Sequence, residues 1–411
     1  MTVADVRAEV TPEAIRAARE VGRDVVQETP VQASRWLADR VGAPVVLKCE
    51  NLQRTGSFKI RGAYLRLSRL GPAERERGVV AASAGNHAQG VALAAKELGI
   101  AARVYMPEGA PIPKEKATRA YGAEVVFAGR TVDDALVAAR EHAEASGATF
   151  VHPFDHPDIV TGQGTLGLEL LEQAPGARTV VVPTGGGGLL AGVAIAVKSV
   201  DPTIRVVGVQ AAGAAAYPGS LAAGRPTALP AMTTMADGIA VGCPGELTFA
   251  AVRDHVDEIR TVGEREIARA LVGLAERAKL VVEPAGAVGV AALLADPAAY
   301  AKAGPVAVVL SGGNIDPLLL DRVIRFGLAA AGRYLTLRVA ISDSAGSLAA
   351  LLGEIGAAGA NVLEVVHART SAALPIEQVS VHLQLETRSE SHAAEVLSRL
   401  QAAGYPAEAV G

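Results

Sequence analysis

The sequence contains few cysteines, few aromatic residues and no long uninterrupted apolar run. Two cysteines, Cys49 and Cys243, occur in 411 residues and form no Cys-x-x-Cys pair. They cannot build a disulfide framework, so a reducing compartment is expected. No apolar run reaches the roughly 18 residues that a membrane-spanning helix needs, and the N-terminal stretch MTVADVRAEV lacks the apolar core of a signal peptide. We therefore expect a cytoplasmic protein with no membrane partner.

An excess of charge of one sign is also absent. Lys and Arg together number 39, Asp and Glu together number 43, and the two signs are interspersed along the chain. The lack of a basic stripe argues against nucleic acid as a partner. Hydrophobic residues make up 50% of the chain. At roughly 150 residues per domain, its length suggests two or three domains, each able to bury a core.

Apolar β-branched runs alternate with helical patterns from residue 43 to residue 314, and this alternation predicts βαβ units with parallel sheets. Around residues 327–335 the pattern changes. From residue 334 onward the order is strand, helix, strand, strand, helix and a short tail, which is typical of a ferredoxin-like module of about 80 residues. The sequence therefore predicts an α/β fold over residues 1–330 and an appended module over residues 331–411.

Four consecutive glycines, at positions 185–188, follow one predicted strand and precede a helix. Bare backbone N–H groups and the positive end of the helix can hold a phosphate there. A tight turn is the alternative, but it needs fewer glycines. The spacing Gly186-x-Gly188-x-x-Ala191 matches a dinucleotide fingerprint, yet the next strand ends at Gln210 instead of an acidic residue, which disfavours a nicotinamide cofactor. No Gly-Lys-Ser/Thr follows, so a nucleoside triphosphate loop is also disfavoured.

Two more glycine-bearing segments follow predicted strands. Residues 83–87 (Ser-Ala-Gly-Asn-His) lead into a helix, and residues 311–314 read Ser-Gly-Gly-Asn. The N–H groups of the first segment can hold a carboxylate, although ordinary helix capping explains its Asn and His equally well. Because carboxyl ends of strands can meet at one crevice of an open α/β sheet, the three junctions are expected to converge.

Lys59 stands between Phe58 and Ile60, just after a turn-forming Thr-Gly-Ser. Most lysines are solvated surface charges. A lysine in an apolar pocket is different, because burial lowers its pKa and leaves a neutral amine that can form a Schiff base. This lysine, a phosphate cradle and a carboxylate cradle together indicate pyridoxal phosphate chemistry on an amino acid.

The segments ENLQRTGSFKIRGA, SAGNHAQG, PTGGGGLLAG and SGGNID, in this order, resemble the motif set of threonine dehydratases (threonine ammonia-lyases), which are fold-type II pyridoxal phosphate enzymes. The resemblance covers residues 10–330. It implies a fold like that of the tryptophan synthase β chain, with a large cofactor domain and a mobile smaller subdomain over residues 70–150. The site would lie in the cleft between them.

The same resemblance assigns a role to each motif. Lys59 is the catalytic Schiff-base lysine, and Phe58 lies near the cofactor ring. Asn86 hydrogen-bonds the ring hydroxyl, and Ser311 faces the pyridine nitrogen. The implied phosphate-binding residues are Gly185, Gly186, Gly187 and Gly188; those receiving the substrate carboxylate through backbone N–H groups are Ser83, Ala84, Gly85, Asn86 and His87; those lining the pocket are Gly238 and Glu283.

The implied activity is that of a carbon–nitrogen lyase. Lys59 removes the Cα proton, the β-hydroxyl leaves, and L-threonine yields 2-oxobutanoate and ammonia. L-Serine should react as well and give pyruvate, because a missing methyl group discriminates by only about 1–3 kcal/mol. The alternatives are a serine racemase/dehydratase or another hydroxy-amino-acid dehydratase of the same fold, a threonine synthase, and a catalytically silent amino-acid-binding regulator.

Two departures from the racemases of this family bear on these alternatives. Ala84 stands where racemases usually carry a serine that acts as the second acid. Racemase-like members also bind a divalent metal through acidic residues, whereas Gln210, Ala214 and Ala216 offer no carboxylate at the corresponding positions. His152 and His156 are each followed by proline, which makes a helical metal face improbable. No metal site is therefore expected.

Residues 334–408 resemble an ACT domain, a small amino-acid-sensing module, through Asp343, Gly346 and Leu348 and through the turn at residues 359–361. The resemblance implies a branched-chain amino-acid effector, isoleucine or valine, and a place in isoleucine biosynthesis. Such modules pair their sheets, so a homo-oligomer, dimer or tetramer, is expected. Oligomerisation without sensing is the alternative.

Overall fold

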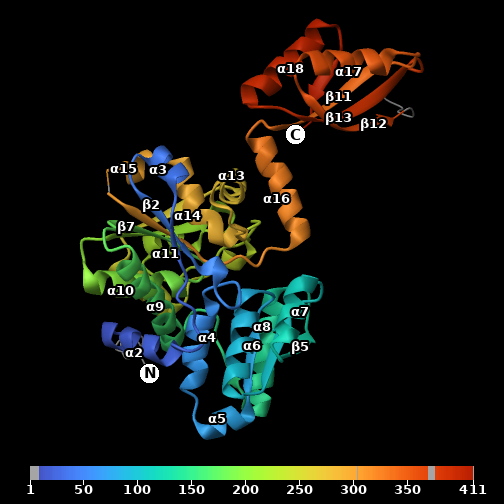
Figure 1. Cartoon of the computed structure of the whole chain (residues 1–411). Helices are drawn as coiled ribbons and strands as arrows, with labels where there is room; N and C mark the ends of the chain where they lie inside the picture. The colour runs from blue at the N-terminus through green and yellow to red at the C-terminus, as the bar shows by residue number, and fades with distance from the viewer. Residues whose placement is uncertain (1–8, 303, 369–374, 411) are drawn as a thin grey trace. The chain divides into compact units, whose positions relative to one another are not determined.

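The computed structural model describes residues 9–302, 304–368 and 375–410 (Figure 1). The chain divides into two compact units, Met1–Leu319 and Leu320–Gly411. The division falls inside helix α16 (Pro317–Ala330), earlier in the chain than residue 330, near which the sequence pattern changes. Among the described residues, no helix is both long enough and apolar enough to cross a membrane.

A six-stranded sheet forms the centre of the first unit. Its neighbouring strands pair in parallel except for the first two, which are antiparallel. The order is β1 (Val31–Ala33), β2 (Val45–Cys49), β10 (Val306–Leu310), β7 (Thr179–Pro183), β8 (Arg205–Ala211) and β9 (Glu258–Val262). Every residue of β7 and β10 is buried. Helices therefore cover both faces of these strands, which explains their nearly continuous valine runs.

A second, four-stranded sheet lies in the same unit and is entirely parallel. Its order is β5 (Glu124–Phe127), β4 (Ala102–Met106), β3 (Val79–Ala82) and β6 (Thr149–Phe150). The helices connecting these strands are α6 (Asn86–Leu98), α7 (Ile112–Ala120) and α8 (Val132–Ser146) (Figure 1). The six-stranded sheet, parallel except for β1, and the parallel four-stranded sheet confirm the α/β fold class that the alternation of strands and helices predicts.

Helix α4 (Lys59–Ser68) packs closely against α6 and α9 (Pro157–Gln173). A Cβ atom at Gly162 would lie only 2.6 Å from the Cα atom of Gly62, and one at Gly90 would lie 3.1 Å from Lys59. Glycines at these crossings let the helix backbones approach each other. As a result, the first residue of α4, Lys59, is held between the helices of the two sheets.

A buried cluster of charges anchors the same helix. Arg61 donates to both Glu50 and Glu169, at distances of 2.6–2.8 Å. Lys48 also donates to Glu169, at 2.8 Å. Two cations face two carboxylates, so no charge in this cluster is buried without an opposite partner.

The second unit has one antiparallel sheet and two helices. Along the chain its elements are β11 (Tyr334–Ser342), α17 (Ser347–Ala357), β12 (Asn361–Ala368), β13 (Gln378–Glu386), α18 (Glu390–Ala402) and β14 (Ala407–Ala409). This is the predicted βαββαβ order of a ferredoxin-like module. The strands lie in the order β12, β13, β11, β14, so β12 is an edge strand. The side chains of Leu363, Val365 and Val366 on that strand are exposed.

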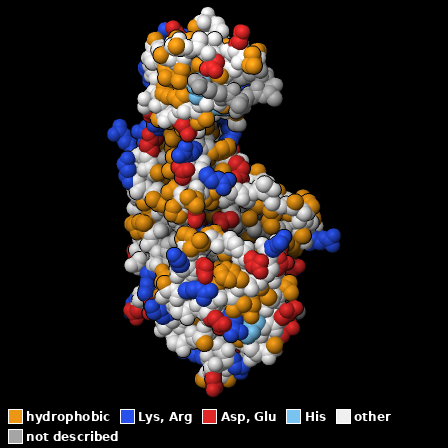
Figure 2. Space-filling model, turned by 90° about the vertical axis from the view of Figure 1, so that its right-hand side faces the viewer, with side chains coloured by type: hydrophobic (Ala, Val, Ile, Leu, Met, Phe, Trp, Pro, Cys, Tyr) orange, Lys and Arg blue, Asp and Glu red, His pale blue; other side chains and the backbone are white. Residues whose placement is uncertain are grey.

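The remaining elements connect or flank these sheets. They are α2 (Pro12–Gly22), α3 (Arg35–Val41), η1 (Glu50–Leu52), α5 (Pro72–Arg77), α10 (Gly188–Val200), η2 (Ala212–Ala214), α11 (Ala216–Ala223), η3 (Asp237–Ile239), α12 (Glu246–His255), α13 (Glu264–Gly273), η4 (Leu274–Ala278), α14 (Pro284–Ala295) and α15 (Ala298–Ala301). On the face seen in Figure 2, acidic and basic side chains are mixed, as the interspersed charges of the sequence predict.

Candidate active site

Lys59 begins α4, and its amine is turned inward. Nζ donates a hydrogen bond to the carbonyl oxygen of Pro153 at 2.8 Å and lies 5.2 Å from the centre of the Phe58 ring. Burial lowers the pKa of this amine to about 8, although the Glu283 carboxylate opposes the shift. Because the ordinary value is 10.5, a much larger share of Lys59 is neutral near pH 8 than of an exposed lysine.

The glycine segment connects β7 to α10. Gly187 has a φ of +95°, a left-handed conformation that favours glycine. Phe154 packs against this segment, because a Cβ atom at Gly188 would lie 2.8 Å from the Phe154 carbonyl oxygen. Within the described part of the chain, the backbone N–H groups of residues 185–188 have no acceptor. Together with the positive end of α10, they form an anion cradle that fits a phosphate.

The segment at residues 83–87 connects β3 to α6 and also contains backbone N–H groups that have no acceptor among the described residues. The N–H groups of Ser83 and Gly85 already donate, to the Tyr105 carbonyl and to the Ser83 hydroxyl respectively. Those of Ala84, Asn86 and His87 have no acceptor among the described residues. A carboxylate can therefore be received by three N–H groups, fewer than the whole segment would provide.

The His87 side chain does not face this carboxylate cradle. Its Nε2 lies 2.9 Å from the carbonyl oxygen of Val151, an acceptor, so Nε2 carries the proton. Burial lowers the pKa of the imidazole to about 3, and the nearby Lys59 charge adds to this effect. The ring is therefore neutral and structural, and His87 offers only its backbone N–H group.

Asn86 and Glu283 are 197 positions apart in the chain but form a hydrogen bond. The Asn86 Nδ2 donates to Glu283 Oε1 at 2.6 Å. Burial raises the pKa of the Glu283 carboxyl to about 7, and the Lys114 ammonium opposes this shift while the Asp237 carboxylate adds to it. Gly238 adjoins this carboxyl, because a Cβ atom at Gly238 would lie 3.5 Å from Glu283 Oε1.

The segment that contains Ser311 pairs with the segment that leads into Lys59. Phe58 donates its N–H to the Ser311 carbonyl at 3.2 Å, and Gly313 donates to the Gly56 carbonyl at 2.8 Å. Ser311 is buried. These contacts join the Ser311 segment to the Lys59 segment, and the Asn86–Glu283 hydrogen bond joins the start of α6 to the Glu283 and Gly238 region.

Lys114 and Asp237 also belong to this region, and the sequence reading did not single them out. Lys114 on α7 is buried, and its Nζ lies 2.8 Å from the Asp237 carboxylate in η3. It also lies 3.7 Å from the position of a Cβ atom at Gly85. The pair links the unit's two sheet-bearing halves beside the carboxylate cradle. Asp237 precedes Gly238 in the ADG stretch, which was the available clue.

The residues considered for a metal site have other contacts. Gln210 Oε1 accepts from the Tyr217 N–H at 2.9 Å. His152 Nδ1 accepts from the N–H groups of the two residues at positions 154 and 155, and His156 caps the start of α9. Among the described residues, no group of three or more His, Cys, Asp and Glu side chains could hold a metal ion.

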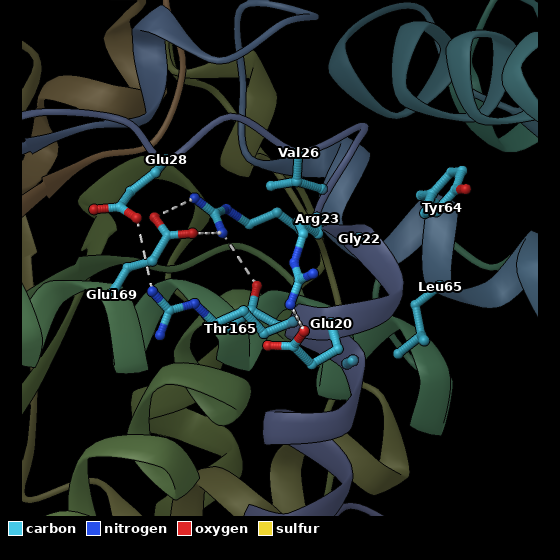
Figure 3. Close-up of a pocket in the computed structure, with 12 residues that line it drawn as sticks. Glu20, Gly22, Arg23, Val26, Glu28, Tyr64, Leu65, Thr165 and Glu169 are labelled. Atoms are coloured by element: carbon cyan, nitrogen blue, oxygen red, sulfur yellow. Dashed lines mark hydrogen bonds and ion pairs between the residues drawn. The ribbon is translucent and has the colours of Figure 1, made fainter.

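A pocket of about 450 Å³ lies elsewhere in the first unit, among α2, α4 and α9 (Figure 3). Its charged side chains are paired with one another or with near neighbours: Arg19 with Glu172, Arg23 with Glu20, and Arg61 with Glu169. None of the residues of the two N–H cradles lines it. This pocket is therefore separate from the candidate active site.

A family model described as pyridoxal-phosphate dependent enzyme matches residues 23–312. The chain belongs to this family. Over 402 residues, it is 47% identical to the L-threonine ammonia-lyase of Thermotoga maritima, covering 98% of this chain and 100% of that protein. Two solved structures resemble it with a TM-score of 0.73 each: maize serine racemase, at 37% identity over 78% of this chain and 98% of that chain, and threonine deaminase isoform 2 of Solanum lycopersicum, at 39% identity over 76% and 91%.

Membership confirms two predictions from the sequence, the fold-type II architecture and pyridoxal phosphate as the cofactor. The residues of this chain fit that cofactor. The N–H groups of residues 185–188 offer a phosphate cradle, and the amine of Lys59 has a pKa lowered to about 8. An amine that loses its proton this readily is suited to bonding with the cofactor aldehyde.

Proposed function

We propose that this protein is an L-threonine ammonia-lyase, a carbon–nitrogen lyase that converts L-threonine to 2-oxobutanoate and ammonia and also converts L-serine to pyruvate. The observation that carries the proposal is the packing around one inward-facing amine: Lys59 donates to Pro153, whose neighbour Phe154 packs on the glycine segment, and Lys59 packs against Gly90 of α6, the helix that follows the carboxylate cradle. The similarity to the Thermotoga maritima enzyme, which spans nearly the whole of both chains, supports the same activity.

When bound, pyridoxal phosphate supplies an electron sink for the electrons of the broken Cα–H bond. The chain's own residues do the rest. The N–H groups of Gly185, Gly186, Gly187 and Gly188 hold the phosphate, and those of Ala84, Asn86 and His87 hold the substrate carboxylate. Lys59 then takes the Cα proton, and its lowered pKa keeps a usable fraction of the amine neutral near pH 8.

We assign the other residues to the cofactor ring. The Phe58 ring lies 5.2 Å from Lys59 Nζ, the Phe58 N–H donates to the Ser311 carbonyl, and Asn86 donates to Glu283. A hydroxyl at Ser311, rather than a carboxylate, would leave the ring nitrogen largely unprotonated. A ring in that state would take up less of the negative charge from Cα, which would disfavour transamination.

Serine racemase is the second candidate, because the maize enzyme has a similar structure. Position 84 argues against it. Ala84 has only a methyl group, which cannot donate or accept a proton; by the resemblance described above, racemases usually carry a serine there. We therefore expect elimination to dominate over inversion at Cα.

We further propose that the chain comprises a catalytic part, residues 1–330, and an ACT domain, residues 331–411, that binds isoleucine or valine. The ferredoxin-like order of the second unit supports the second assignment. Exposed Leu363, Val365 and Val366 on the edge strand β12 favour a homo-oligomer in which this edge is covered. The cytoplasmic location expected from the sequence stays a prediction.

One assay tests the proposed activity. Purified protein is supplied with L-threonine, L-serine or hydroxyaspartate, and release of ammonia and of the oxo acid is measured. The Lys59→Ala variant is the control, and it should lose both the visible absorbance of the bound cofactor and all turnover. Turnover retained by this variant would refute the assignment of Lys59 as the catalytic lysine. Failure of the wild type to release 2-oxobutanoate from L-threonine would overturn the proposed function.

A further inference from the structure

The side-chain amide of Asn86 can present either its nitrogen or its oxygen in a given direction. The two orientations fill almost the same space, so hydrogen-bond partners decide between them. Asn86 Nδ2 donates to Glu283 Oε1 at 2.6 Å, and Asn86 Oδ1 accepts from Asn314 Nδ2 at 2.8 Å. If the amide were reversed, its oxygen would face the Glu283 carboxyl and its nitrogen would face the Asn314 nitrogen. The hydrogen bond from Asn314 would then be lost, and a bond with Glu283 would form only while that carboxyl is protonated.

The orientation of Asn314 is itself fixed. Its Nδ2 also donates to the backbone carbonyl of Thr55 at 2.7 Å. A carbonyl oxygen can only accept, so the nitrogen of Asn314 must face both Thr55 and Asn86. The amide of Asn314 packs against Gly56, which has a φ of +70°. A Cβ atom there would lie 2.9 Å from Asn314 Cγ. The Asn314 side chain therefore has little room to move away.

These contacts join segments that are far apart in the chain. Thr55 and Gly56 lead directly into Lys59, and Asn314 follows β10. The two segments already pair through a bridge between Ser57 and Gly312. The Asn314 side chain extends this pairing to Asn86, the first residue of α6. It thus connects the segment that positions Lys59 with the helix that begins at the carboxylate cradle.

We propose that Asn314 is a positioning residue that sets the orientation of the Asn86 amide, so that Asn86 presents a hydrogen-bond donor to Glu283 and to the ring hydroxyl of the bound cofactor. This inference rests on the cofactor-binding role proposed for Asn86. A donor at that place favours the ionised form of the ring hydroxyl, since hydrogen bonds to a charged form stabilise it. Asn314 acts through Asn86 and not by its own contact with the cofactor.

The test uses Asn314→Asp, which keeps the shape of the side chain but replaces its donor with an acceptor. Asn86 is then expected to reverse and to donate to the new carboxylate. Two quantities are measured on purified protein: the affinity of the cofactor-free form for pyridoxal phosphate, by titration of the visible absorbance, and the pH at which the absorbance of the bound cofactor changes. We expect at least about a tenfold loss of affinity, the equivalent of one lost hydrogen bond of about 1.4 kcal/mol, and a shift of the spectral pH midpoint.

A matched control and a double-mutant cycle separate positioning from general damage. Asn51 is also buried and donates to a backbone carbonyl, that of Val281, at 3.1 Å. Asn51→Asp adds a buried carboxylate but keeps the Asn314–Asn86 hydrogen bond, so it should shift the spectral midpoint less than Asn314→Asp does. In an Asn86→Ala background, Asn314→Asp should have little further effect on either quantity, because the residue through which it acts is gone. Asn314→Ala, which removes the donor without adding charge, provides the same measurements if the aspartate variant does not fold.

Two results would overturn the inference: a folded Asn314 variant with unchanged affinity and spectral midpoint, or effects that add in full to those of Asn86→Ala. Neither readout depends on which amino acid is turned over. A wild type that binds pyridoxal phosphate but does not release 2-oxobutanoate from L-threonine would overturn the proposed lyase and leave this inference standing.

Discussion

Gly187 offers a quantitative test of the glycine segment. Its φ of +95° is a conformation that costs an L residue about 1–2 kcal/mol. A Cβ atom there would overlap the Tyr217 hydroxyl, lie 2.9 Å from Tyr217 Cζ and lie 3.1 Å from Thr248 Cβ. Tyr217 is fully buried and donates to the Gly186 carbonyl, so it cannot simply move away. Overpacking of this kind adds about 1–3 kcal/mol.

Gly187→Ala is therefore expected to destabilise the cofactor-free protein by about 2–5 kcal/mol, the sum of the two contributions. The free energy of unfolding is measured by denaturant titration. Because the carboxyl-terminal unit is a separate compact body, the transition of residues 1–319 is followed through Trp36, the chain's single tryptophan. Binding of pyridoxal phosphate should weaken as well, since the N–H groups of the cradle would be displaced.

Two further variants separate the backbone contribution to this destabilisation from the overpacking contribution. Gly224 also has a left-handed backbone conformation, with a φ of +69°, but a Cβ atom there would have no neighbouring atom within 4 Å. Gly224→Ala should therefore show the backbone cost alone, about 1–2 kcal/mol. Adding Tyr217→Phe to Gly187→Ala should relieve part of the overpacking, because the overlapping hydroxyl is removed. The reasoning is refuted if Gly187→Ala costs no more than Gly224→Ala, or if Tyr217→Phe brings no relief in the double variant.

Three other perturbations test the remaining parts of the argument. Folding lowers the pKa of Lys59 from 10.5 to about 8, so the unfolded chain binds more protons than the folded chain between these pH values. The cofactor-free wild type should therefore gain stability as pH rises from 8 to 10.5. Denaturation at several pH values should show this gain in the wild type and its absence in the reference variant Lys59→Met. Truncation after residue 330 should leave lyase activity but abolish any response to isoleucine or valine; inhibition that persists in kinetic assays would place the sensing site elsewhere. Ala84→Ser introduces a hydroxyl at the start of α6, and the positive end of the helix eases ionisation of that hydroxyl. The variant should therefore yield D-serine from L-serine alongside pyruvate. Substantial D-serine from the wild type, measured by chiral chromatography, would contradict an enzyme that only eliminates.

The sequence by itself determined the local elements of the site. A strand followed by four glycines and a helix predicts an anion cradle, and residues 185–188 offer one, since glycine takes the left-handed backbone at position 187 without steric cost. The order of strands and helices likewise determined two largely parallel sheets and a ferredoxin-like unit. These features depend on backbone conformation and hydrophobic periodicity over short stretches, which neighbouring residues specify.

The boundary between the two units was harder to predict from the sequence than the strands and helices were. The boundary between the two compact units lies between Leu319 and Leu320, within the continuous helix α16. The helical pattern runs through this point without interruption. A change of sequence pattern becomes visible only where the helix gives way to β11, which is why the sequence predicts a boundary near residue 330.

Only the tertiary structure decided which way the polar side chains of the site face. The sequence assigned the backbone N–H of His87 to the carboxylate cradle but could not orient its side chain, which the Val151 carbonyl, 64 positions away, binds in the folded protein. Asn86 meets Glu283 and Asn314 across separations of 197 and 228 positions. A polar side chain takes the orientation that satisfies its hydrogen-bond partners, and here those partners come from remote segments that share no local pattern with it.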